Sequence, residues 1–200
     1  MRVYMVRHGE TILNQKGCYY GTSDVDLTDR GIAQAEELQK ILNGITFDQV
    51  ITSPLIRARR TASLVTGRNM DDMISDHRLE EQHFGIFEGM TYRKLQKTYP
   101  GELALWNRDY MNYRIPGGES FLDVRRRIGD YCRELRELSD RKGTILLAAH
   151  KGTFGHMLAE LLHLPPEGYW HFVFEQGCYS CVDLEDGTVI IRKLNTRERI

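Results

Sequence analysis

The chain passes from a strand into a helix at Thr144-Ile145-Leu146-Leu147-Ala148-Ala149-His150-Lys151-Gly152. The residues before His150 form a continuous apolar run of strand length, which is typical of a strand buried on both faces. A helical pattern follows from Thr153 to about His163, and Pro165-Pro166 ends it. A buried strand that leads directly into a helix indicates an α/β fold built on a parallel sheet.

Strand and helix alternate in the same way nearer the N-terminus. We expect strands at Arg2 to Val6 and at Gln49 to Thr52, with a helix from Thr28 to Asn43-Gly44 between them. Ser53-Pro54 is typical of a helix start, with Ser53 as N-cap and Pro54 at the first position of a helix that runs through about Val65. These units predict further parallel strands beside the one at 144–149.

The remaining segments contain more helices and a late group of strands. Helices are expected at residues 92–99 and 102–111 and from the N-cap Ser120 onward, and strands near 170–174, 178–183 and 188–194, the last two as a hairpin. The predicted fold class is α/β: a three-layer sandwich with a mostly parallel central sheet, an antiparallel edge strand and helices on both faces. No repeat or linker interrupts the chain, so residues 1–200 are predicted to form a single domain.

The composition excludes several classes of protein. The 200 residues carry 27 Lys and Arg against 28 Asp and Glu, so no global positive field draws the chain to nucleic acid or to an anionic membrane. With 41% hydrophobic residues the chain can bury a core, which excludes disorder as its main state. No apolar run approaches the roughly 20 residues of a membrane span, and the N-terminus lacks a signal-peptide pattern, so a cytoplasmic protein is predicted.

The four cysteines do not indicate a metal or redox centre. Cys178 and Cys181 match the C-x-x-C pattern, but they fall in a predicted strand, where residues three apart point to opposite faces. A zinc site would also need a second ligand pair at suitable spacing. We expect ordinary buried thiols in a reducing compartment and no metal site.

Charged or polar side chains follow three of the predicted strands. Arg7 and His8 come after the first strand, Ser53 and Arg57 follow the second, and His150 follows the strand described first. The carboxyl ends of parallel strands meet at one edge of a sheet, where ligands bind. Guanidinium groups match phosphate oxygens and helix N-termini add N–H donors, so we expect a phosphoryl-binding crevice with local charge from Arg7, Arg57 and His150.

His8 is the candidate nucleophile of this crevice, because a neutral imidazole can hold a phosphoryl group as a covalent intermediate. Gly9 allows a close approach of the backbone, and a carbonyl at this point is expected to accept from Nδ1 of His8, which leaves Nε2 to attack. A lone histidine is more often a packing residue, but convergence with the other two strand ends makes that explanation hard to support.

Several motifs in a fixed order resemble the histidine phosphatases of the phosphoglycerate mutase-like superfamily. The resemblance runs from residue 2 to about residue 195, and it implies the fold of that superfamily. The motifs that carry it are Arg7-His8-Gly9-Glu10-Thr11 with Asn14, Leu27-Thr28 with Gly31, Thr52-Ser53-Pro54-Leu55 with Arg57-Ala58, Glu81 with Phe84-Gly85 and Glu88-Gly89, Pro116-Gly117-Gly118-Glu119-Ser120, and Ala149-His150. The first motif alone would be weak evidence.

The resemblance implies a phosphomonoester hydrolase that works through a phosphohistidine. His8 would attack the ester, water would then release phosphate, and His150 would join in catalysis. Glu81 would protonate the leaving alcohol and then activate the water, with its neighbour Glu80 as the rival for this role. No metal or cofactor is expected, since preorganised charge, covalent attack and positioning act together. The residues that would bind the phosphoryl oxygens are Arg7, Arg57, His150 and Asn14.

Within the family, phosphatase is favoured over mutase. The family's mutases carry a long insertion that helps to close the site against water, and this chain is short there. The segments 116–120, 162–165 and 192–195 resemble the α-ribazole phosphatases, which act late in cobalamin assembly, so α-ribazole 5′-phosphate is the expected substrate. The alternatives are a broad-specificity sugar-phosphate phosphatase, a phosphoglycerate mutase and a regulatory module that binds phosphate without turnover.

Substrate choice is expected to depend on side chains of the loops. Cys18 and Tyr20 stand where many relatives have Arg and Gln, and Lys151 stands where many phosphatases have glycine. Lys151 either adds a cation beside the phosphate or points to solvent. The candidates for binding the leaving group are Tyr20, Gly21, Arg108 and Lys151, and further candidate lining residues are Cys18, Tyr19, Tyr92, Trp106 and Arg114.

The remaining predictions concern partners and surface residues. The expected partner is a small phosphorylated metabolite, and the chain is expected to act as a monomer or homodimer, without nucleic acid or a membrane. The run Arg125-Arg126-Arg127 is expected to be mostly solvated. The residues expected to be structural, on helix or strand surfaces, are His77, His83, His156, His163 and His171.

Overall fold

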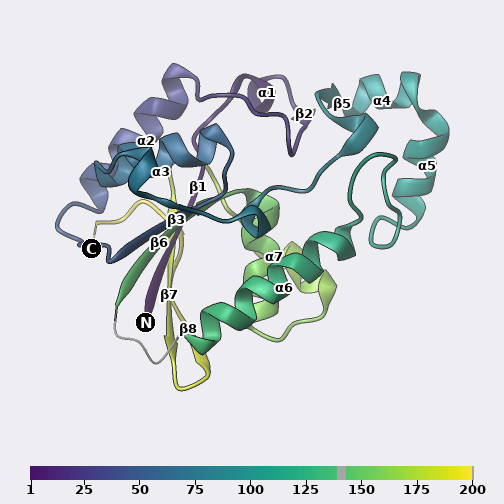
Figure 1. Ribbon diagram of the computed structural model, residues 1–200. Coiled ribbons are helices and arrows are strands. Elements are labelled where there is room, and N and C mark those ends of the chain that lie inside the picture. Colours follow the sequence, from purple (N-terminus) through teal and green to yellow (C-terminus); the bar gives the residue numbers. More distant parts are fainter. Residues whose placement is uncertain (139–142, 200) are drawn as a thin grey trace.

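A six-stranded sheet forms the centre of the computed structural model, which describes residues 1–138 and 143–199 (Figure 1). The strand order is β4-β3-β6-β1-β7-β8. The first four strands in this order run parallel, and β7 and β8 are added antiparallel at the β1 edge. The strands are β1 (Arg2–Arg7), β3 (Gln49–Thr52), β4 (Ile74–Ser75), β6 (Thr144–Ala149), β7 (Tyr179–Glu185) and β8 (Thr188–Thr196).

Helices cover both faces of this sheet (Figure 1). α2 (Asp29–Ile41) and α3 (Ile56–Thr66) pack on one face, where Leu38 shares a core with Tyr4 of β1. α6 (Phe121–Glu137) and α7 (Lys151–Leu161) pack on the other, where Ile128 shares a core with Met5. Alternate residues of β1 therefore contribute to two cores. The predicted three-layer α/β fold with an antiparallel edge is confirmed.

A smaller group of helices, α4 (Tyr92–Thr98) and α5 (Pro100–Arg108), extends to one side of the main sheet (Figure 1). It adjoins a two-stranded sheet formed by β2 (Cys18–Tyr19) and β5 (Met90–Thr91). The buried residues Phe87, Leu95, Leu103 and Ile115 give this part its own core. The remaining short elements are α1 (Ile12–Gln15) and the 3₁₀ helices η1 (Met70–Asp72), η2 (His77–Leu79), η3 (Gly85–Phe87) and η4 (Pro166–His171).

Side-chain caps begin several helices, but not all where the sequence suggests. The Thr28 hydroxyl accepts from the Gly31 N–H at the start of α2, and Ser120 forms a capping box at the start of α6. Ser53 is not an N-cap: α3 begins at Ile56, and the Ser53 hydroxyl lies 2.9 Å from Nε2 of His150. The same hydroxyl accepts at 3.4 Å from the N–H of Leu55, which precedes the first helical residue, so the predicted N-cap is wrong by two residues.

The expected strand at residues 170–174 is also wrong. The 3₁₀ helix η4 occupies Pro166–His171, with Pro166 at its first position. Tyr169 of this helix packs edge-on against Phe121, with ring centroids 5.1 Å apart, and its ring lies so close to Gly155 that a Cβ there would be 2.7 Å away. Packing of this aromatic segment on α7 therefore outweighs its strand propensity.

The side chains of Arg125, Arg126 and Arg127 in α6 are all expected from the sequence to be mostly solvated, and only one of them is. Arg126 is exposed, with 75% of its side-chain surface accessible. Arg125 instead pairs with Glu160 of α7 at 2.8 Å, and Arg127 pairs with Glu119 at 2.9 Å. The prediction is wrong for these two arginines, because their carboxylate partners come from other segments of the chain.

All four cysteines are free thiols; Cys181 lies within β7, and Cys178 directly precedes that strand.

Among residues 1–138 and 143–199, no helix is both long enough and apolar enough to cross a membrane.

Candidate active site

The carboxyl ends of β1, β3 and β6 bring the predicted site residues together. His8 N–H donates to the Ala149 carbonyl and Ser53 N–H to the Ala148 carbonyl, both at 3.0 Å, so the three strand ends lie side by side. A cavity of about 200 Å³ opens at this edge. The predicted residues that line it are Arg7, His8, Asn14, Cys18, Tyr19, Tyr20, Arg57, Glu81 and Lys151.

His8 is held with one ring nitrogen available to the cavity. Its Nδ1 lies 2.7 Å from the Gly9 carbonyl oxygen, the contact that the sequence predicts. Because a carbonyl only accepts, Nδ1 carries the proton and Nε2 has the free lone pair. Burial, reinforced by Arg7 and Arg57, lowers the pKa of His8 well below its usual value. The side chain is therefore a neutral imidazole at pH 7, as a nucleophile requires.

The backbone around His8 is fixed by close packing on α2. A Cβ on Gly9 would lie 2.4 Å from the Gly31 carbonyl oxygen, so the loop after β1 and the first turn of α2 can approach only without side chains. Gly9 N–H also donates to the Thr61 hydroxyl of α3 at 3.0 Å. The nucleophile candidate thus lies on a rigid loop.

Two positive charges lie beside His8, of which Arg57 is fully buried and Arg7 is half-buried. Arg57 donates to the carbonyls of Ser23 (2.9 Å) and Gly21 (2.6 Å), and Arg7 donates to the Phe174 carbonyl (2.9 Å). Neither arginine has an ion pair within the described residues, and Nε of each is buried without a partner. Burial lowers the pKa of both groups. Two desolvated cations without carboxylates form a strong site for an anion.

His150 is fully buried behind His8, with the ring centroids 5.1 Å apart. Its Nε2 contacts the Ser53 hydroxyl at 2.9 Å, and its Nδ1 has no partner in the described chain. Burial, followed by the charge of Arg57, lowers the pKa of His150 well below its usual value. His150 is therefore a neutral hydrogen-bonding group at pH 7, and the positive charge of the site comes from the two arginines rather than from His150.

Glu81 and Glu80 lie on different sides of their loop. The Glu81 carboxylate lines the cavity and accepts from Gly152 N–H at the start of α7 and from Gln82 N–H, both at 3.0 Å. Glu80 instead contacts Nδ1 of His77 at 2.5 Å and lines a separate surface hollow. Of the two carboxylates, the geometry favours Glu81 as the acid at the cavity.

Asn14 and Tyr20 form a polar network at the rim. Asn14 Oδ1 accepts from the Tyr20 hydroxyl (2.9 Å) and from Nε2 of Gln176 (2.7 Å). The Arg57 guanidinium lies 4.7 Å from the centre of the Tyr20 ring. Gly21 contributes through its backbone, since its carbonyl accepts from Arg57. The structure therefore places Tyr20 and Gly21 against Arg57.

The other predicted substrate residues divide into two groups. Lys151 lines the cavity, and its side chain has no hydrogen bond or ion pair within the described chain. Arg108 is exposed at the end of α5 and lies outside the cavity wall. Tyr92, Trp106 and Arg114 are not in the wall either, because the helices that carry Tyr92 and Trp106 pack around a separate small core.

The cavity wall also contains residues that the sequence analysis missed. His156 is buried, not on a surface as expected, and its ring packs between Phe121 (centroids 4.3 Å apart) and Tyr169 (4.8 Å). Burial lowers the pKa of His156 to about 3. The available signal was its position four residues after Gly152, which puts both on one face of α7.

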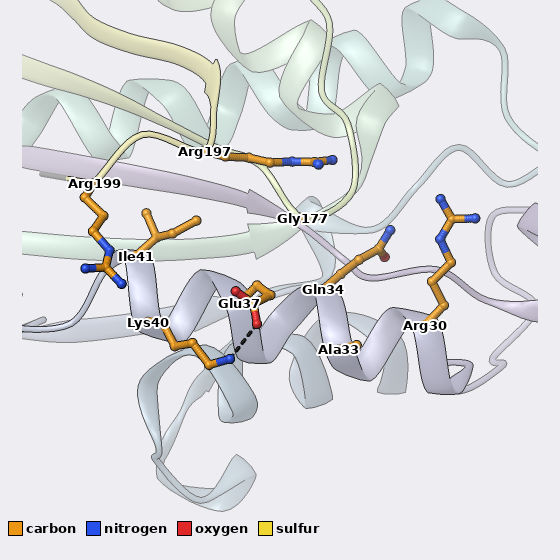
Figure 2. A pocket seen from close by; sticks show the side chains of 9 residues that line it. All are labelled: Arg30, Ala33, Gln34, Glu37, Lys40, Ile41, Gly177, Arg197 and Arg199. Carbon is orange, nitrogen blue, oxygen red and sulfur yellow. Dashed lines mark hydrogen bonds and ion pairs between the residues drawn. The ribbon is translucent and has the colours of Figure 1, made fainter.

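A larger hollow of about 570 Å³ lies between α2 and the C-terminal residues (Figure 2). Figure 2 shows Arg197 and Arg199 reaching over α2, whose Lys40 is paired with Glu37 at 2.5 Å. Its walls contain no histidine or cysteine and none of the predicted site residues. Its arginines and lysine are exposed, so it lacks both the nucleophile and the buried charge of the cavity at His8.

Comparison with known proteins agrees with this fold. The chain belongs to the histidine phosphatase superfamily (branch 1), whose family model matches residues 3–197. It is similar to the adenosylcobalamin/alpha-ribazole phosphatase of Salmonella typhimurium, with 37% identity over 98% of this chain and 97% of that protein. The protein of the same name from Escherichia coli is 34% identical over the same shares of the two chains.

A solved structure of another alpha-ribazole phosphatase has the same fold. The alpha-ribazole phosphatase from Shigella flexneri superposes with a TM-score of 0.94 at 34% identity, over 100% of this chain and 98% of that one. The predicted family, and with it the class of phosphatase, is confirmed.

Proposed function

We propose that this protein hydrolyses α-ribazole 5′-phosphate to α-ribazole and phosphate through a phosphohistidine on His8. The names of its full-length relatives support the substrate. The observation that carries the chemistry is the position of His8, whose Nδ1 donates to the Gly9 carbonyl and which lines one cavity with the guanidinium groups of Arg7 and Arg57. A neutral nucleophile beside fixed positive charge suits attack on a phosphate ester.

In the first step, Nε2 of His8 attacks phosphorus. The N–P bond forms as the P–O bond to the alcohol breaks, and protonated Glu81 gives its proton to the departing oxygen. Arg7, Arg57 and Asn14 bind the phosphoryl oxygens, and His150 contributes a hydrogen bond. The charge that develops on these oxygens is stabilised by groups that are already in place, so the site needs little reorganisation.

In the second step, water attacks the phosphohistidine. The Glu81 carboxylate takes a proton from the water, the new P–O bond forms, and the N–P bond breaks to return His8 with Nδ1 protonated. The Gly152 N–H donates to the Glu81 carboxylate and keeps it at the cavity, where the ionised carboxylate accepts this proton. One carboxyl group thereby serves as acid and then as base, as reversal of the proton transfer requires.

The leaving-group half of the cavity is aromatic. Phe84, Phe121 and Tyr169 line it together with Tyr19. Flat rings of this kind stack on an aromatic base such as the benzimidazole of α-ribazole. Lys151 at the rim supplies a flexible cation for the phosphate. We place this reaction in the cytoplasm, with residues 1–200 acting as one catalytic domain that uses neither metal nor cofactor.

A release assay across phosphomonoesters tests the proposal. The panel contains α-ribazole 5′-phosphate, phosphoserine, several sugar phosphates and 3-phosphoglycerate with 2,3-bisphosphoglycerate. We expect the highest kcat/KM with α-ribazole 5′-phosphate and no activity in His8→Ala. Strong preference for another ester contradicts the substrate, formation of an isomer in place of free phosphate indicates a mutase, and equal activity in His8→Ala contradicts the nucleophile.

A further inference from the structure

We propose that Arg127 is a positioning residue that holds Glu81 for proton transfer and thereby sets how strongly the rate depends on the leaving group. The inference rests on the acid–base role proposed for Glu81, and it assigns a function to a side chain that touches neither the nucleophile nor the cavity.

Glu81 lies on a segment without regular secondary structure. The 3₁₀ helix before it ends at Leu79, and the next begins at Gly85. No ladder or helical hydrogen bonds therefore fix the backbone of Glu81. General acid catalysis needs the proton donor within hydrogen-bond distance of the leaving oxygen, so this backbone must be held by other contacts.

Arg127 supplies those contacts from α6. Its Nη1 donates to the carbonyls of Arg78 (2.7 Å) and Glu80 (2.8 Å), and its Nη2 donates to the carbonyl of Glu81 itself (3.0 Å). The two remaining N–H groups, one on Nε and one on Nη2, donate to the Glu119 carboxylate at 2.9 and 3.0 Å. A guanidinium has five N–H donors, and all five have an acceptor here.

Glu119 adds hydrogen bonds to the other end of the loop at residues 80–84, and together with those of Arg127 they form what we call the clamp. Its Oε2 accepts from His83 N–H at 3.0 Å, while Gln82 Nε2 donates to its backbone carbonyl at the same distance. On the α7 side, the Thr153 hydroxyl contacts the Glu80 carbonyl at 2.9 Å. The backbone of residues 78–83 is thus tied to α6, to the loop before it and to α7, while the Glu81 carboxylate is left to face the cavity.

Burial and chemistry indicate a fitted clamp rather than a surface ion pair. Only 19% of the Arg127 side chain and 23% of the Glu119 side chain are exposed. Lysine could not replace this arginine, because one ammonium cannot reach three carbonyls and two carboxylate oxygens at once. Arg126, the preceding residue of α6, is a natural control, since 75% of its side chain is exposed and its one ion pair within the described residues is with Asp123 at 3.5 Å.

The test compares two esters whose need for an acid differs. An alkyl phosphate such as α-ribazole 5′-phosphate releases a poor leaving group, whereas 4-nitrophenyl phosphate releases an anion that is stable without protonation. Single-turnover rates of alcohol release report the first step alone for each ester. The variants are Arg127→Met, Arg127→Lys, Glu119→Gln, Glu81→Gln, the double variant Glu81→Gln with Arg127→Met, and the control Arg126→Met, each checked by thermal melting.

We expect Glu81→Gln to slow the alkyl ester by about 10²-fold or more and the aryl ester far less. Arg127→Met should lower the rate of alcohol release by about tenfold to 10²-fold for the alkyl ester and by less than about threefold for the aryl ester. The rates of Arg127→Lys and Glu119→Gln with the alkyl ester should lie between those of Arg127→Met and wild type. Arg127→Met should add no further loss in the Glu81→Gln background, because the group it positions is then absent.

A purely structural role predicts a different pattern. If the Arg127 and Glu119 variants slow both esters equally, or if their losses multiply with that of Glu81→Gln, Arg127 does not position the acid. If Glu81→Gln itself shows no selectivity for the alkyl ester, both the acid role of Glu81 and this inference are overturned. If Arg127→Met does not fold, Arg127→Lys and Glu119→Gln provide the same test, because the loss of rate with the alkyl ester is again compared with the loss with the aryl ester.

Discussion

Replacing Arg57 by methionine separates the effect of a buried charge on stability from its effect on catalysis. Arg57 is fully buried, donates to the carbonyls of Ser23 and Gly21, and has no carboxylate partner within the described residues. Its desolvation costs several kcal/mol, which a bound phosphoryl group offsets. The flexible methionine fills much of the same space without a charge.

The two effects have different expected magnitudes. Arg57→Met loses two hydrogen bonds from a charged donor, about 3–6 kcal/mol together, but recovers a desolvation cost of similar size, so Tm should change by less than about 4 °C. Two charged hydrogen bonds to the transferring phosphoryl group are worth the same 3–6 kcal/mol, so kcat/KM should fall by about 10²- to 10⁴-fold.

Phosphate release and thermal melting measure both quantities on one preparation. Inorganic phosphate should raise the Tm of the wild type, because a ligand that binds only the folded state stabilises it, and this rise should be lost in Arg57→Met. Arg60→Met is the matched control, since Arg60 lies on the same helix and pairs with Asp26 at the surface. A kcat/KM within threefold of wild type, together with an unchanged rise of Tm, would refute the proposed anion site.

Three further predictions concern Gly152, His156 and the effect of removing metal ions. Gly152→Ala should slow hydrolysis of α-ribazole 5′-phosphate by at least about tenfold, because its Cβ would lie 2.1 Å from Glu81 Oε1. Gly101→Ala is the control, since a Cβ at this position meets open space. Equal rates for the two variants would show that Glu81 tolerates displacement. The pKa of His156 is about 3 against an ordinary 6.5, so the unfolded chain binds the extra proton and the free energy of unfolding decreases as pH falls from about 6.5 towards 3. His156→Phe should reduce the loss of stability between pH 7 and pH 4.5 in urea titrations by about 2 to 3 kcal/mol, and an unchanged loss contradicts a neutral buried His156. Prolonged dialysis against EDTA should leave activity unchanged, since the proposed mechanism takes its positive charge from Arg7 and Arg57; loss of activity that added metal restores would contradict it.

The parts of the fold that the sequence predicts correctly depend on local patterns. The apolar run of β6, the caps of α2 and α6 and the hairpin of β7 and β8 each have a signal within a few neighbouring residues. The position of the site follows from the same information, because the ends of parallel strands must meet at one edge. His8 and Arg57 could thus be placed together from residues about fifty positions apart.

The features that the sequence analysis missed depend on contacts between distant segments. The Ser53 hydroxyl contacts His150, which is ninety-seven positions away. Arg127 contacts the loop at residues 78–81 from 46 to 49 positions away, and nothing in the run of three arginines distinguishes it from the exposed Arg126. His156 becomes part of the cavity wall only when η4 brings Tyr169 against α7. Such partners are set by tertiary packing, which local pattern does not record.

The most direct test of the account is isolation of the covalent intermediate. The enzyme is mixed with α-ribazole 5′-[³²P]phosphate, quenched within milliseconds in alkali, digested and mapped by mass spectrometry. We predict label on the peptide that contains His8, stable in alkali, released by acid, and absent in His8→Ala. Turnover without a labelled intermediate, or label on any other residue, would contradict His8 as the nucleophile.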